Sequence, residues 1–152
     1  MELYQMLPDF RRESFAWIDS MEGCLLHLED TPGCCAAIND LLRVIHTLKE
    51  SAGLFGLDGV VVLAGAMENV LFRVCEGEVA SDEPLITLLL SCCSRMRMLI
   101  GQTGSDATGR PHLKIETTEV ELLGQLDEYW PEAPVVQAGR LVPARAEAVA
   151  IT

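Results

Sequence analysis

Aromatic residues and positive charges are scarce in this sequence. Phe, Tyr and Trp make up 5% of the 152 residues, so the core must be built from aliphatic side chains, which favour helices over strands. Lys and Arg number 11 against 23 Asp and Glu, which gives a formal net charge of −12. Such a surface repels phosphate backbones and anionic lipids, and we therefore expect no nucleic-acid partner and no membrane partner.

Long apolar runs and metal-binding spacings are also missing. No apolar run approaches the roughly 18 residues that a membrane span needs, and no signal peptide opens the chain, so we expect a cytoplasmic protein. Two pairs among the six cysteines are vicinal, which fits reduced thiols better than disulfides. Cys24-x-x-His27 followed by Cys34-Cys35 comes nearest to a zinc motif but lacks its spacing. We favour small buried hydrophobic residues there, with no metal and no cofactor.

Apolar residues three and four apart predict four helices. These helices run from about Pro8 or Asp9 to Leu28, from Cys35 to Phe55, from Asp58 to Val74 or Glu76, and from Pro84 to about Ile100. Gly77 is a plausible C-cap of the third helix, and Ser81-Asp82-Glu83-Pro84 is typical of a helix start.

The remainder of the chain predicts one more helix and a tail. Residues 101–116 are rich in Gly, Thr and Ser and predict a loop. Thr118-x-x-Glu121 is a capping box for a short fifth helix that ends at Tyr129 or Trp130. Because short loops favour antiparallel neighbours, we expect an all-α fold, an antiparallel four-helix bundle with an additional C-terminal helix. Residues 1–130 would form this domain, and residues 131–152 a linker or disordered tail.

The second helix contains the stretch HTLKESAGLFG, residues 46–56. At 100° per residue, His46 lies about 130° from the centre of the apolar seam and should be exposed. Leu42, Lys49 and Gly53 share its flank. Glycine costs about 1 kcal/mol against alanine in a helix interior, so Gly53 indicates a surface that is kept clear for a partner.

Counting from a turn at Gly56-Leu57 places a carboxylate near this histidine. His46 and Glu68 are each 11 positions from Leu57, so both lie roughly 16 Å from the turn. A carboxylate that accepts a hydrogen bond from Nδ1–H would leave Nε2 as a nucleophile, and Lys49 could offset the charge of an incoming phosphoryl group. Geometry alone equally allows a solvated Glu68.

HTLKESAGLFG followed by AMENVLFRVCEGE resembles the histidine phosphotransfer (HPt) domain at the N-terminus of CheA-type chemotaxis histidine kinases. The similarity covers about residues 8–130 and implies the same five-helix fold. It implies that His46 is phosphorylated, that Glu68 is its hydrogen-bonding partner and that Lys49 is an accessory cation. It further implies that a separate CheA-type kinase catalytic domain uses ATP as the donor and that response regulator receiver domains accept the phosphoryl group on an aspartate. We expect no ATP site and no kinase activity in this chain alone, which lacks G-x-x-x-x-G-K-[ST].

Two positions depart from the family pattern. Glu50 stands where the family usually has glycine, and Gly65 stands where some members have a second histidine. Glu50 adds negative charge near the phosphoryl group, and we expect it to line a partner-docking surface with Leu42 and Gly53. The alternative to phosphotransfer is a helical adaptor or dimerisation module in which His46 is incidental. His27 and His112 are weaker candidates for modification, because neither has a lysine three positions on.

Overall fold

The structure is a computed structural model that describes residues 3–103, 117–129, 135–137 and 140–142. Within these ranges the elements are a 3₁₀ turn at Leu3–Met6, α1 (Leu7–Asp30), α2 (Cys35–Leu54), α3 (Asp58–Cys75), α4 (Glu83–Gly101), α5 (Thr117–Asp127), β1 (Val135–Gln137) and β2 (Arg140–Val142). The predicted loop at 101–116 lies almost entirely outside the described residues, as does His112.

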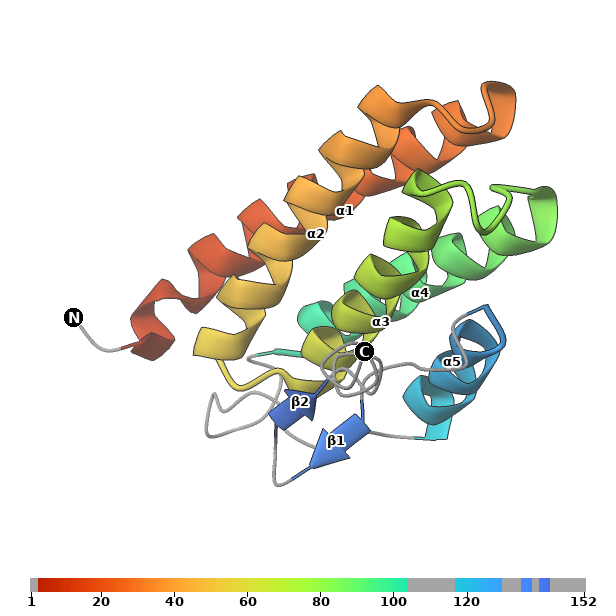
Figure 1. Ribbon diagram of the computed structural model, residues 1–152. Coiled ribbons are helices and arrows are strands. Elements are labelled where there is room, and N and C mark those ends of the chain that lie inside the picture. Colours follow the sequence, from red (N-terminus) through yellow and green to blue (C-terminus); the bar gives the residue numbers. More distant parts are fainter. Residues whose placement is uncertain (1–2, 104–116, 130–134, 138–139, 143–152) are drawn as a thin grey trace.

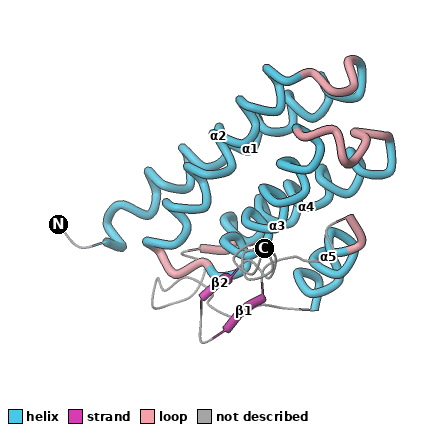
Figure 2. The backbone as a smooth tube through the Cα atoms, viewed as in Figure 1, coloured by secondary structure: helices cyan, strands magenta, loops and turns pink. Residues whose placement is uncertain are grey.

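Helices α1 to α4 form an antiparallel four-helix bundle (Figures 1 and 2). Helix α1 packs against α2 and α4, and α3 packs against the same two helices from the other side. Helix α5 lies beside α3 and α4, outside the bundle. The predicted all-α fold with an additional C-terminal helix is therefore confirmed.

The apolar seams form the core. The apolar residues that predicted the helices are Phe10, Trp17, Ile18, Met21, Leu25 and Leu28 in α1, Ile38, Leu41, Ile45, Leu48, Ala52 and Phe55 in and just after α2, Val60, Ala64, Met67, Leu71 and Val74 in α3, and Ile86, Leu89, Cys93, Met96 and Ile100 in α4. All of them are buried except Trp17, which is partly exposed. The fully buried members with the largest side chains include Ile18, Met21, Leu25, Leu28, Ile38, Leu41, Ile45, Leu48, Met67 and Leu71. The three-and-four spacing thus located the bundle interior, because it places each of these side chains on one face of its helix.

Helix ends follow local chemistry. The side chain of Asp82 accepts a hydrogen bond from the backbone N–H of Leu85 at 3.2 Å and caps α4, with Pro84 in the first turn, as predicted. Gly77 follows α3 with a φ of 78°, which confirms it as the residue that ends this helix. The predicted capping box of α5 is wrong, because the helix already begins at Thr117 and Thr118 lies within its first turn.

Helix α4 is long and apolar enough to cross a membrane by length and composition alone, which corrects the expectation that no segment qualifies. Half of that stretch is buried inside the protein. Its apolar side chains pack against α1 and α3, and this packing accounts for the composition without a bilayer.

Strands β1 and β2 pair antiparallel, with Val135 opposite Val142 and Gln137 opposite Arg140. The sequence did not predict this hairpin, because three-residue strands are too short to show an alternating pattern. Both strands fall within residues 131–152, whose other residues lie outside the described ranges. The assignment of this range to a linker or tail stays a prediction.

A buried ion pair fastens α5 to the bundle. The Arg95 guanidinium of α4 donates to the Glu119 carboxylate of α5, and Glu119 is fully buried. Gly59 makes room for this contact, since a Cβ there would come within 3.5 Å of the Glu119 side chain and 3.0 Å of Leu99.

Glu119→Ala should lower the free energy of unfolding by about 3–5 kcal/mol, because it leaves the Arg95 charge buried without this carboxylate. Urea unfolding measures the change. The matched control is Glu121→Ala, on the exposed face of the same helix, which should change stability by less than about 0.5 kcal/mol. Equal effects of the two substitutions would show that the buried pair does not anchor α5.

Cys92 and Cys93 are core residues of α4. The expectation of buried cysteines at Cys24, Cys34 and Cys35 is wrong, because Cys24 and Cys34 are only partly buried and Cys35 is exposed. Burial raises the pKa of the Cys92 thiol from its ordinary 9.0 to about 12, and burial together with the neighbouring Cys92 also raises the pKa of Cys93. Both thiols are therefore protonated in the folded protein at neutral pH.

The raised pKa of Cys92 predicts a loss of stability in alkali. Below pH 9.0 the Cys92 thiol is neutral in both the folded and the unfolded protein, and its burial contributes fully to the free energy of unfolding. As the pH rises toward 12 this contribution is lost, because the thiol ionises in the unfolded chain but stays neutral in the folded one. The stability difference between wild type and Cys92→Ala should therefore shrink from about pH 8 to about pH 11. A difference that stays constant over this pH range would contradict the raised pKa of Cys92.

Candidate functional site

The turn between α2 and α3 sets the register of the site. The backbone N–H of Leu57 donates to the carbonyl of Ala52 at 3.0 Å and that of Gly56 to the carbonyl of Gly53 at 3.2 Å. Gly56 has a φ of 71°, a left-handed conformation that favours glycine, so the set is a Schellman motif. The chain reverses here and α3 returns antiparallel along α2 (Figure 1).

His46 projects from α2 with 54% of its side chain exposed, as its position off the apolar seam predicted. Its Nδ1 lies 3.4 Å from Oε2 of Glu68 on α3. This confirms the prediction, made by counting residues from the turn, that the two side chains lie side by side. Only 12% of the Glu68 side chain is exposed. A largely buried carboxylate thus faces one ring nitrogen of an accessible imidazole.

Lys49 contacts the same carboxylate. Its Nζ lies 2.6 Å from Oε1 of Glu68, a close ion pair whose bond directions do not meet hydrogen-bond geometry. This places the ammonium one helical turn from His46 and on its flank. Lys49 therefore neutralises Glu68 and restricts the position of this side chain beside the ring.

Glu50 contacts the other ring nitrogen. Its Oε1 lies 3.0 Å from Nε2 of His46, although 70% of the Glu50 side chain is exposed. The sequence predicted an exposed Glu50 near the site but an open Nε2, and the second expectation is wrong. Residues four apart lie on one face of a helix, and the Glu50 rotamer turns the carboxylate toward the ring instead of toward water.

The remaining residues that we predicted for the site surround this group on α2. Leu42 is half-buried and Gly53 is exposed. A Cβ built at Gly53 meets no described atom within 4 Å outside its own helix backbone, so packing within the described part of the chain does not explain the glycine. Gly65 is buried on α3 and supplies no side chain to the site.

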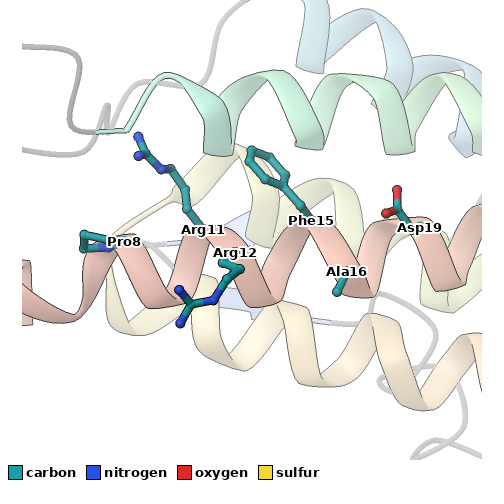
Figure 3. Close-up of a pocket in the computed structure, with 6 residues that line it drawn as sticks. All are labelled: Pro8, Arg11, Arg12, Phe15, Ala16 and Asp19. Carbon is teal, nitrogen blue, oxygen red and sulfur yellow. The ribbon is translucent and has the colours of Figure 1, made fainter.

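Hollows also lie elsewhere on the surface. The described residues that line one of them all belong to α1, and Figure 3 shows Arg11 and Phe15 pointing toward α4 while Arg12 points to the opposite side. Arg11 donates to the carbonyl of Thr103 at 2.7 Å and Arg12 to Asp9 at 2.6 Å, so both cations are engaged in structural contacts.

Another hollow is lined by Cys24 and His27 of α1 and by Cys34, which directly precedes α2. Among the residues that the structure describes, no three His, Cys, Asp or Glu side chains converge closely enough to hold a metal ion. The hollow therefore offers no ligand set, although it gathers three members of the motif that came nearest to zinc spacing.

The family model for the Hpt domain matches residues 5–99, which include α1 to α3 and most of α4. The chain belongs to the Hpt domain family. The sensor histidine kinase CheAY of Helicobacter pylori is 29% identical to this Hpt domain over 124 residues, which cover 80% of this chain and 15% of that protein. The chemotaxis protein CheA of Listeria monocytogenes is 26% identical over 118 residues, which cover 78% of this chain and 19% of the relative.

These matches concern one part of much longer proteins, because the Hpt domain spans less than a fifth of either relative. Among solved structures, the phosphorylated P1 domain of CheA3 in complex with CheY6 from R. sphaeroides is similar, with a TM-score of 0.68 and 23% identity. The similarity covers 83% of this chain and 95% of that one. At this identity the match establishes the fold.

Gly53→Ala should raise the free energy of unfolding by up to about 1 kcal/mol, because alanine is the better helix former and its Cβ meets open space. Urea unfolding of the isolated domain measures this change. The control is Gly59→Ala on α3, where the new Cβ would press on Leu99 and should cancel or reverse the gain. Destabilisation by Gly53→Ala would mean that the surface beside His46 is not open.

Proposed function

We propose that this Hpt domain carries a phosphoryl group on Nε2 of His46. A separate CheA-type kinase domain that binds ATP supplies the group, and an aspartate on a response regulator receiver domain takes it. The observation that supports this most directly is an exposed imidazole whose Nδ1 faces the buried carboxylate of Glu68. The proteins that are similar to this chain include a sensor histidine kinase, which agrees with such a role.

The chemistry needs the proton on Nδ1. The Nε2 lone pair attacks the γ-phosphorus of ATP, the bond from this phosphorus to the bridging oxygen breaks, and ADP leaves. The proton stays on Nδ1, where Glu68 accepts its hydrogen bond and stabilises the positive charge that the ring acquires. In the second step a carboxylate oxygen of the receiver attacks the phosphorus, and the N–P bond breaks to regenerate neutral imidazole.

Lys49 acts on the charge of the phosphoryl group. An ammonium has three donor hydrogens, so Lys49 can contact Glu68 and still present a donor to a phosphoryl oxygen on Nε2. Its partial exposure, at 28% of the side chain, leaves that approach open. Lys49 would thereby lower the barrier to transfer in both directions.

Partners would dock on the exposed flank of α2, where Leu42, Glu50 and Gly53 surround His46. The open surface at Gly53 gives a receiver domain access to the ring. We place this exchange in the cytoplasm, with ATP bound on the kinase domain and no cofactor held by the Hpt domain itself.

Incubation with ATP and a CheA-type kinase core should add one phosphoryl mass that is lost in acid and kept in alkali. His46→Gln should abolish labelling, and adding a receiver domain should remove the label from wild type. The matched control is His27→Gln, an exposed histidine on α1, which should label like wild type. Equal labelling of wild type and His46→Gln, or no labelling of either, would refute the proposal and favour the helical adaptor or dimerisation module.

A further inference from the structure

Nε2 is the nitrogen that must attack phosphorus, yet it is not open in this structure. Oε1 of Glu50 lies 3.0 Å from it, closer than Glu68 lies to Nδ1 at 3.4 Å. Both ring nitrogens of His46 therefore face a carboxylate oxygen at or near hydrogen-bond distance. A carboxylate is an acceptor only, so each can contact the ring favourably only where the ring nitrogen carries a proton.

A neutral imidazole has one N–H, and the two carboxylates compete for it. With the proton on Nδ1, Glu68 can accept a hydrogen bond from Nδ1–H, and the lone pair of Nε2 is free to attack phosphorus. With the proton on Nε2, Glu50 can accept a hydrogen bond from Nε2–H, and Nε2 has no lone pair for the attack. A hydrogen bond to either carboxylate would fix the tautomer of the ring, and the two glutamates would fix opposite ones.

The surroundings of the two acids differ. Glu68 is mostly buried, comes from the neighbouring helix and is held by Lys49. Glu50 comes from the same helix as His46, and its side chain is mostly exposed. Within the part of the chain that the structure describes, only the ring contacts the Glu50 carboxylate, so Glu68 is the fixed acid and Glu50 the one free to leave.

We propose that Glu50 is a positioning residue that holds His46 in the unreactive Nε2–H tautomer and thereby restrains phosphorylation of the resting domain. This inference rests on the proposed function of His46, and it adds control of the His46 tautomer by a residue of the same helix. Glu50 must leave Nε2 before the phosphoryl group can arrive, and its negative charge then lies close to the phosphoryl dianion. The residue therefore slows loading of the histidine.

The tautomer ratio is measured directly by ¹H–¹⁵N spectra of the full chain with ¹⁵N-labelled histidine rings, at a pH where titration shows the ring to be neutral. The chain has three histidines, so the signals of ring 46 are assigned by their loss in His46→Gln. Glu50→Gln keeps the length and helix propensity of the side chain and removes its charge, whereas Glu50→Ala removes the acceptor as well.

The Nε2–H fraction of His46 should fall from wild type to Glu50→Gln and fall further in Glu50→Ala. Glu68→Gln should move the ratio in the opposite direction, because it weakens the competing acceptor. Glu29→Gln, which removes an exposed carboxylate from the last turn of α1, is the matched charge control and should leave the ratio unchanged.

The rate is measured without any protein partner by using phosphoramidate as donor. The Nε2 lone pair attacks phosphorus, the bond from phosphorus to the amide nitrogen breaks, and ammonia leaves. Glu50→Gln should label His46 roughly two- to fivefold faster than wild type, the range expected for one exposed charged contact, and the ratio should shrink as salt is added. Glu29→Gln should label at the wild-type rate.

An unchanged tautomer ratio, or an unchanged rate of labelling in both Glu50 variants, would overturn this inference while leaving His46 as the phosphoacceptor. A failure of every variant to label, with phosphoramidate and with the kinase alike, would instead refute the proposed function. The tautomer spectra would still decide in that case whether Glu50 controls the ring.

Discussion

The contact between the imidazole of His46 and the carboxylate of Glu68 depends on two helices being level with each other. Nδ1 and Oε2 are 3.4 Å apart, and one residue of slip along either helix would move them by about 1.5 Å. The Schellman turn at Gly56 fixes this register at one end, and the buried seams of α2 and α3 maintain it along their length. Lys49 then holds the carboxylate in place.

The other helices pack around this pair. Helices α1 and α4 cover their inner faces, and α5 is attached to α4 by the buried pair of Arg95 and Glu119. The outer face of α2 is left uncovered by the described part of the chain, so His46 combines an accessible ring with a fixed acid. A carrier of phosphoryl groups needs both properties, because the ring must meet two partners in turn while one tautomer is favoured.

Much of this arrangement could be predicted from the sequence. Helix positions followed from the apolar seams, and the pairing of His46 with Glu68 followed from counting residues on both sides of the turn. The contact of Glu50 with Nε2 could not be predicted, because a side chain at the fourth position can point to the ring or to water, and rotamers decide which. The burial of Glu119 was also missed, since its partner Arg95 lies 24 residues away and neither residue type marks a core.

The central claim is that phosphorus joins Nε2 of His46 while the proton stays on Nδ1 beside Glu68. The most direct measurement is a ¹H, ¹⁵N and ³¹P correlation spectrum of the phosphorylated domain with labelled histidine rings. Phosphorus should couple to Nε2 of residue 46, and Nδ1 should carry a proton whose signal changes in Glu68→Gln. Phosphorus on Nδ1, or on the ring of another histidine, would contradict this claim.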